Sequence, residues 1–277
     1  MLDTTRAYGL DFLFPETDTT VGRCLRNFGE FAKVESDLMA DYVRLAKPGM
    51  IIDVGANIGS ISLPVAKQFP EQAFLAIEGH MGLAQILSTN AFGNKLYNVQ
   101  VLHAAAGAEG GLVSFPSVRL STVGNFGTLS IDQVALGMRH SRTRMLTLDE
   151  VAATETRFVK IDVEGYEPEV LKGAKRILNE VRPVWLIEAA RSYEAPARAT
   201  IATMLAADYD VYWFYAPFVC KAANKPTDLT PPPEGDHNIV AVPKGGPNLW
   251  DLEPILSADA DFPRHIDRFP YLKRYGF

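Results

Sequence analysis

Residues 50–60, MIIDVGANIGS, form the stretch that decides the fold. The apolar run before Asp53 predicts a buried strand, and Gly55 and Gly59 predict a tight turn that leads into a helix. Glycine lets the backbone turn and approach a ligand without a Cβ clash, and the first turn of a helix presents unpaired N–H groups. We therefore expect an α/β fold in which this turn binds a nucleotide-like ligand. An ordinary strand-to-helix turn is the alternative.

The turn favours one class of ligand over another. A dinucleotide site would need the pattern G-x-G-x-x-G, but Asn57 replaces the middle glycine here and Ser60 the last. The Asp53 carboxylate would repel a pyrophosphate in a crevice of low dielectric and would attract an ammonium group. S-adenosylmethionine (SAM) carries an ammonium group, so the turn favours SAM over NAD.

A second acidic residue follows the next apolar run. Residues 73–77, AFLAI, predict a short strand that ends at Glu78. Ligands of α/β sheets lie at the carboxyl ends of the strands, and an acidic residue about 20 residues beyond the glycine turn can accept both hydroxyls of a ribose. Glu78 is therefore expected to bind a ribose, with a solvated turn residue as the alternative. Residues 99–106 predict a third strand whose small residues at 104–106 leave room for adenine or for close helix packing.

Two further strands also end on carboxylates. Residues 158–162, FVKID, predict a fourth strand that brings Asp162 and Glu164 to the same edge of the sheet. Residues 184–188, VWLIE, predict a fifth strand that ends at Glu188. Carboxylates at this edge are costly to desolvate unless they bind something. Glu164 has a second interpretation, as a cap of the helix that follows.

The remaining pattern predicts helices and a late pair of strands. Helices are expected at 33–46, 60–68, 81–93 and 197–207, and an antiparallel edge pair at 210–215 and 238–242. Residues 108–144 are irregular, which is typical of a lid or binding loop, and their basic residues form either an anion site or a solvated loop. We expect an N-terminal cap and leading helix at 1–46, the main domain at 47–245 and a packed tail at 246–277.

Composition excludes several classes of protein. The chain has 277 residues, of which 47% are hydrophobic and 22% charged, as in an ordinary globular protein. Its net charge of −6 argues against a nucleic-acid binder. Two cysteines are too few for a disulfide framework. No apolar run approaches the roughly 20 residues that span a bilayer, so we expect a cytoplasmic protein without a membrane span. The sequence predicts no oligomeric state.

Several segments together match the motifs of one family. They are GEFAKVESDL at 29–38, IDVGANIG at 52–59, AIEGH at 76–80, TLDE at 147–150, VKIDVEGYEPEVLKGA at 159–174 and LIEAA at 186–190. In this order the segments resemble the FkbM-like family of SAM-dependent methyltransferases. The resemblance spans about half the chain, and the KIDVEG segment is its most specific part. His80 departs from the family pattern, which usually has proline there, and this departure leaves the shape of the turn after Glu78 open.

The resemblance implies a fold and a cofactor site. The fold would be a class I methyltransferase (Rossmann-like) α/β sheet of seven strands in the order 3-2-1-4-5-7-6, with strand 7 antiparallel and helices on both faces. Glu78 would bind the ribose of SAM, and the residues after the fourth strand would face its methyl group. The cofactor site would be lined by Glu35, Asp53, Gly55, Asn57, Gly59, Glu78 and Asp162.

The expected activity is O-methylation of a hydroxyl on a sugar, glycan or secondary metabolite. A hydroxyl must lose its proton as the new bond forms, and a positioned carboxylate can accept it. Asp162, Glu164 and Glu188 are the candidate catalytic residues, with Asp162 and Glu164 favoured. A divalent metal on Asp162 and a neighbouring carboxylate is left out of the expectation, because no His or Cys set supports it. The alternatives are an N-methyltransferase, a non-catalytic SAM-binding protein and, less favoured, an NAD-type oxidoreductase.

Overall fold

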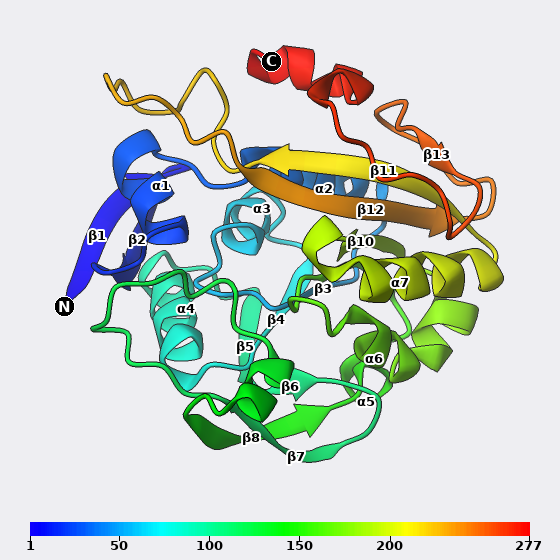
Figure 1. The fold of residues 1–277 in the computed structure, drawn as a ribbon, viewed down its shortest axis with the longest axis horizontal. Coiled ribbons are helices and arrows are strands. Elements are labelled where there is room, and N and C mark those ends of the chain that lie inside the picture. Colours follow the sequence, from blue (N-terminus) through cyan, green and yellow to red (C-terminus); the bar gives the residue numbers. More distant parts are fainter.

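The computed structural model describes the backbone of residues 1–277 and all side chains except those of residues 135 and 136. At its centre lies a mixed sheet in the strand order β13-β11-β12-β10-β9-β3-β4-β5 (Figure 1). Its strands are β3 (Met50–Val54), β4 (Ala73–Glu78), β5 (Val99–His103), β9 (Thr156–Ile161), β10 (Val184–Glu188), β11 (Tyr209–Pro217), β12 (Gly235–Pro243) and β13 (Pro254–Ile255).

The directions of the strands confirm an α/β fold with a mixed central sheet. Strands β5, β4, β3, β9 and β10 run parallel to one another, whereas β12 is antiparallel to both β10 and β11. The described sheet has eight strands, one more than expected, because Pro254 and Ile255 pair with the outer edge of β11. The inner parallel strands β3, β4, β9 and β10 are largely apolar and buried, whereas β5 at the edge of the sheet is only partly buried.

Helices cover both faces of the sheet. In Figure 1, α2 lies behind β11 and β12, whereas α7 lies in front of β10. The predicted helices are confirmed, with ends that shift by up to three residues. The α-helices that follow the N-terminal segment are α2 (Lys33–Leu45), α3 (Ser62–Gln68), α4 (Met81–Gly93), α5 (Leu148–Val151), α6 (Glu167–Lys172) and α7 (Glu194–Ala206).

Residues 1–30, for which the sequence predicted no helix or strand, form a hairpin and a helix. Strands β1 (Leu2–Ala7) and β2 (Leu10–Pro15) pair antiparallel, and α1 (Val21–Phe28) follows them. Buried apolar residues of β2 pack against α4. The amide of Asn90 on α4 accepts from the Leu13 N–H at 2.7 Å and donates to the Leu13 carbonyl at 3.0 Å. The hairpin is therefore attached to the main sheet through α4.

The prediction of an irregular segment at 108–144 is wrong in part. Strands β7 (Gly111–Pro116) and β8 (His140–Leu146) pair antiparallel, and β6 (Ala105–Ala106) joins them in a separate sheet. The predicted strand at 99–106 is also wrong beyond His103, because the chain leaves β4 there and pairs with β8 instead. The chain between β7 and β8, residues 117–139, includes the 3₁₀ helix η1 (Ile131–Leu136) and is called the covering segment below.

The basic residues of this region are solvated. Arg139, His140, Arg142 and Arg144 are all exposed, whereas Thr143 between two of them is buried. This alternation is the pattern of a strand with one face in solvent.

The C-terminal residues form an aromatic layer on β11. After β13 the chain forms two 3₁₀ helices, η4 (Ile266–Arg268) and η5 (Pro270–Tyr275), which lie at the top of the view in Figure 1. The ring centroids of Phe262 and Trp213 lie 4.9 Å apart, and those of Tyr271 and Phe214 lie 5.4 Å apart. No described helix is long and apolar enough to cross a membrane.

Candidate active site

The turn after β3 is built by left-handed backbone conformations. Gly55, Asn57 and Gly59 have φ values of 79°, 50° and 86°. The N–H of Gly55 donates to the carbonyl of Ile77 on β4 at 2.9 Å, which holds the turn against the neighbouring strand. A Cβ on Gly55 would lie 1.8 Å from the carbonyl oxygen of Asp162, so glycine is required for the two backbones to meet. Asparagine is among the few other residues that tolerate the left-handed region.

The predicted residues of this turn differ in what they face. Gly55 and Asn57 line the cavities at the carboxyl ends of the strands. Gly59 lines neither cavity and faces two helices instead. A Cβ at this position would lie about 2.5 Å from side-chain atoms of Leu63 on α3 and Leu87 on α4. The role of Gly59 is to let two helices pack against the turn.

Glu78 holds the second side of the site. Its Oε2 accepts from the N–H of Asn57 at 2.9 Å, and its Oε1 accepts from the N–H of His80 at 2.7 Å. Burial raises the pKa of Glu78 to about 7, although these two hydrogen bonds oppose the shift. The carboxylate lines one cavity while it also fixes the two turns beside it.

The departure at His80 has a structural role. Its N–H is the donor to Glu78, and a proline at this position would have no such N–H. Its Nδ1 also accepts from the Leu83 N–H at 3.4 Å and caps the start of α4. The turn after Glu78 is therefore closed by histidine rather than by proline.

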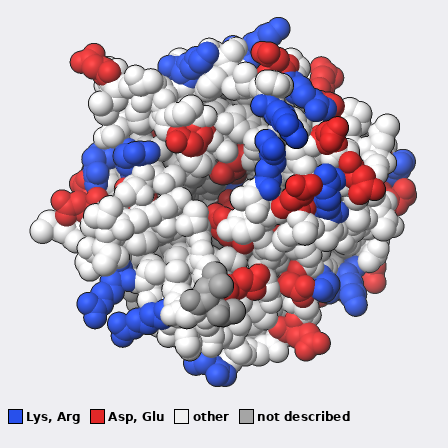
Figure 2. Space-filling model, viewed as in Figure 1, with Lys and Arg blue, Asp and Glu red and all other residues white. Residues whose placement is uncertain are grey.

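Two cavities meet at the carboxyl ends of the strands. The first, the Glu78 cavity, is enclosed by Glu78, by the alanines at 104–106 and by the rings of Phe115 and Phe126. The second, the carboxylate cavity, has a volume of about 320 Å³ and is lined by Asp53, Asp162, Glu164, Glu188 and Asp236. They share Gly55, Asn57, Gly127 and Asp162. Figure 2 shows acidic side chains in and around a hollow near the centre of this face.

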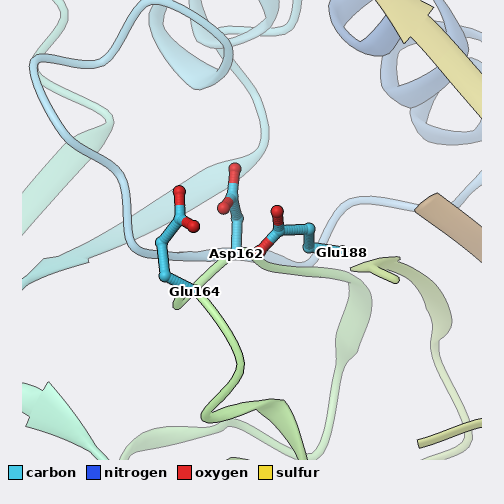
Figure 3. Close-up of side chains that lie close together, drawn as sticks. All are labelled: Asp162, Glu164 and Glu188. Carbon is cyan, nitrogen blue, oxygen red and sulfur yellow. The ribbon is translucent and has the colours of Figure 1, made fainter. Parts of the chain in front are cut away.

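All three predicted catalytic residues come together in the carboxylate cavity. Asp162 and Glu164 follow β9 and Glu188 ends β10, so neighbouring parallel strands bring their side chains to one edge of the sheet. Each offers an oxygen within 4.8 Å of an oxygen of the other two, and Figure 3 shows Asp162 between the others. Burial and the neighbouring carboxylates Asp162 and Glu167 raise the pKa of Glu164 to about 8. Burial and the same kind of repulsion raise the pKa of Glu188 well above its ordinary value.

A buried lysine connects this cluster to the residues behind it. Lys160 on β9 places its Nζ 2.9 Å from Asp162 Oδ2 and 4.0 Å from both Glu35 Oε2 and Asp53 Oδ1. The three acidic groups raise the pKa of Lys160, against the effect of burial. Glu35 on α2 also accepts from the Asn238 amide at 3.2 Å. Glu35 lines neither cavity, so the structure places this predicted cofactor residue behind the wall of the site.

The turn that carries Glu164 is held by Glu167. One oxygen of Glu167 accepts from the N–H groups of Val163 and Gly165, each at 3.1 Å. Glu164 itself has a left-handed backbone, with φ at 56°. The residue at the start of α6 is Tyr166, so the helix-capping interpretation of Glu164 is wrong.

Sequence reasoning missed two contributors to the site, Lys160 and Asp236. Lys160 carried one signal, because a lysine inside a buried apolar strand needs charged partners. Asp236 carried none, since it reaches the cavity only through the folding of distant parts of the chain. The covering segment, which lies within the region expected to be a lid or binding loop, does line both cavities.

Several buried oxygens at the site have no donor. Asp53 Oδ1, Asn57 Oδ1 and Glu188 Oε2 are all buried and without a hydrogen-bond partner among the described residues. All three residues line the carboxylate cavity. Such groups are expected where a ligand donates hydrogen bonds or carries positive charge.

A mixed α/β sheet with a glycine turn after one strand and carboxylates at or next to the ends of four strands is typical of a Rossmann-like domain. Residues 53–211, more than half of the chain, match the family model of the methyltransferase FkbM domain. The chain therefore belongs to the FkbM methyltransferase family, as its motifs predicted. No curated protein matches the sequence.

Similar solved structures are distant in sequence. A precorrin-6y C5,15-methyltransferase from Geobacter metallireducens GS-15 is 14% identical, with a TM-score of 0.49 over 76% of this chain and 87% of that one. An FkbM methyltransferase from Methylobacillus flagellatus KT is 14% identical, with a TM-score of 0.46 over 80% of this chain and 60% of that one. An O-methyltransferase from Bacillus cereus, in complex with SAH, is 15% identical, with a TM-score of 0.45 over 83% of this chain and 84% of that one. The family assignment rests on the family model.

Proposed function

We propose that this methyltransferase binds SAM and methylates a hydroxyl group of a small molecule or glycan. The observation that supports this most strongly is the junction of the two cavities at Gly55 and Asp162. It joins a ribose-type site around Glu78 to a cluster of carboxylates that can receive a proton.

The residues of the Glu78 cavity fit the cofactor. The Glu78 carboxylate has lone pairs left for the two hydroxyls of a ribose. The alanines at 104–106 and the rings of Phe115 and Phe126 line an apolar slot of about 50 Å³, which would have to widen to admit adenine. On the other side of the junction, Asn57 Oδ1, which has no hydrogen-bond partner among the described residues, and the Asp53 carboxylate, whose Oδ1 lies 4.0 Å from Lys160 Nζ, suit an ammonium group. When bound, SAM supplies a methyl group activated by a positively charged sulfur.

The carboxylate cavity would hold the acceptor. In-line methyl transfer is accelerated mainly by holding the acceptor oxygen close to the methyl carbon and in line with the breaking bond. Asp162, shared by both cavities, lies where the two ligands would meet. Asp162, Glu164 and Glu188 are the residues proposed to orient the hydroxyl and accept its proton. A cavity of about 320 Å³ suits a small molecule or one terminal sugar.

An amine acceptor is the second candidate. The acidic residues Asp162, Glu164, Glu188 and Asp236 line the same cavity and would attract a protonated amine. An amine needs less help in losing its proton than a hydroxyl does. Asp162→Asn should therefore abolish activity on hydroxyl acceptors and spare activity on amines.

The first test is calorimetric titration of the folded, cofactor-free protein with SAM and, separately, with NADH. SAM should bind and NADH should not. Glu78→Ala should weaken SAM binding by about tenfold to a hundredfold, the effect of losing hydrogen bonds to a charged group. Glu109→Ala is the matched control, because Glu109 is exposed and lies on neither cavity.

Failure of SAM to bind would overturn the proposed cofactor. If SAM binds as expected, a screen of hydroxyl and amine acceptors with methyl-labelled SAM follows. Labelled product from hydroxyl compounds supports the proposal, and label only in amines would favour the second candidate.

A further inference from the structure

We propose that Asp162, Glu164 and Glu188 bind one hard divalent cation of the Mg²⁺, Mn²⁺ or Ca²⁺ type. Each side chain offers an oxygen within 4.8 Å of the other two, and the three carboxylates point toward one another (Figure 3). Oxygens on opposite sides of a cation lie about 4.2 Å apart for Mg²⁺ and about 5 Å apart for Ca²⁺. A cation therefore fits among them with little movement of the side chains.

Glu188 gives a second, independent indication of a ligand. The residue is only 5% exposed, and its Oε2 has no hydrogen-bond partner among the described residues. A buried carboxylate oxygen without a partner costs free energy, and a solvated acidic patch would not contain one. Coordination of a cation would satisfy this oxygen.

The charge balance of the cluster leads to the same inference. Lys160 lies 2.9 Å from Asp162 Oδ2, which leaves Asp162 Oδ1 available. Within the described part of the chain, no lysine, arginine or histidine nitrogen lies within 4.0 Å of a carboxylate oxygen of Glu164 or Glu188. Asp236 adds a further carboxyl group to the wall. One ammonium group therefore faces four carboxyl groups, and a divalent cation would supply positive charge that the described side chains around Glu164 and Glu188 lack.

The ligands also indicate the kind of cation. All three are carboxylates, which suit hard cations such as Mg²⁺, Mn²⁺ and Ca²⁺ rather than zinc or copper. Three carboxylates leave coordination positions free on the side of the cavity. If the proposed function holds, one of these positions would receive the acceptor hydroxyl, so this role rests on that function, whereas binding of the cation does not.

The test is titration of metal-free protein with Mn²⁺, followed by the electron paramagnetic resonance signal of free Mn²⁺. One Mn²⁺ per chain should bind with a dissociation constant below about 1 mM and be displaced by Mg²⁺ or Ca²⁺. Glu188→Gln keeps the shape of the side chain and should weaken Mn²⁺ binding at least about tenfold, the effect of losing one charged ligand. Glu164→Gln serves as a second variant because Glu164 is half-buried. Glu109→Gln, on the exposed surface, should leave the affinity unchanged.

The outcomes separate this proposal from the proposed function. No Mn²⁺ binding at about 1 mM, or equal binding by wild type and both cluster variants, would overturn the cation site. SAM titration in EDTA, run in parallel, tests the cofactor independently of metal. Mn²⁺ binding without SAM binding would keep the cation site and reject the function, and the reverse result would keep the function and reject the cation site.

Discussion

At the scale of single residues, the ionisation of Glu78 decides what the first cavity can bind. Only the carboxylate form can accept hydrogen bonds from both hydroxyls of a ribose in addition to those from Asn57 and His80. Burial raises the pKa of Glu78 from its ordinary value of 4.5 to about 7. The residue therefore changes its charge near neutral pH.

Binding of SAM should weaken as the pH falls. With a pKa of about 7, Glu78 is roughly 90% ionised at about pH 8 and roughly 10% ionised at about pH 6. The affinity should fall up to about tenfold over this interval, as measured by calorimetry at each pH. Glu78→Gln is the control, since it has the same shape and no charge. An identical pH dependence in this variant would show that another group is responsible.

The same shift has the opposite effect on stability. The folded state holds a proton on Glu78 between about pH 4.5 and 7, where the unfolded state has released it. The contribution of Glu78 to stability therefore decreases as the pH rises through this window. The buried negative charge of Glu78 therefore lowers the stability of the folded protein near neutral pH, but the same charge can accept hydrogen bonds from a ligand.

Lys160 is the buried cation on which the wall of the site depends. Lys160→Met should lower the free energy of unfolding by about 3–5 kcal/mol, because it leaves Glu35, Asp53 and Asp162 without a counter-charge. Urea denaturation measures this change. Lys172→Met is the matched control, since Lys172 pairs with Glu169 on the surface and such pairs contribute about 0–1 kcal/mol. Similar losses in the two variants would contradict this role for Lys160.

Some residues of the site could be predicted from the sequence and others could not. Asp53, Glu78, Asp162 and Glu188 could be predicted, because each lies within one residue of the carboxyl end of an apolar strand and parallel strands place these ends at one edge. Lys160 could not be placed, since two of its three partners, Glu35 and Asp53, lie more than 100 residues away in the chain. Local patterns identify strand ends, whereas pairings across the sheet depend on the fold.

At the scale of elements, the turn between β3 and α3 and the turn after β9 form one unit. The backbones of Gly55 and Asp162 are in contact, so the shape of each turn depends on the other. The sequence showed this turn clearly because glycine marks left-handed backbone conformations. Strands β7 and β8 were less visible, because they carry exposed polar and basic residues in place of the continuous apolar run of a buried parallel strand.

Gly55→Ala should disturb both turns at once. Alanine would adopt φ near 79° at a cost of about 1–3 kcal/mol, and its Cβ would clash with the Asp162 carbonyl. We expect a lower melting temperature and loss of SAM binding. Gly93→Ala is the control, because nothing lies within 4 Å of a Cβ at this helical glycine and alanine favours helices by about 0.5–1 kcal/mol. If Gly55→Ala binds SAM like wild type, the close contact is not needed.

At the scale of the whole molecule, the last residues of the chain complete the edge of the sheet. The outer edge of β11 is paired with β13 only at Val211 and Tyr212. Farther along the strand, the hydroxyl of Tyr271 accepts from the Tyr215 N–H at 2.7 Å and donates to the Tyr215 carbonyl at 2.9 Å. A side chain therefore occupies the place of another strand, and an exposed edge is avoided.

Tyr271→Phe should weaken the attachment of the C-terminal segment to the sheet. The variant keeps the ring against Phe214 but leaves the N–H and carbonyl of Tyr215 without this partner, at a cost of about 1–3 kcal/mol in the free energy of unfolding. Urea denaturation measures the loss, and Tyr97→Phe is the control because Tyr97 is 76% exposed. SAM affinity should stay unchanged, since Tyr271 lines neither cavity. Unchanged stability would mean that water replaces the hydroxyl and that the aromatic packing alone holds the segment on β11.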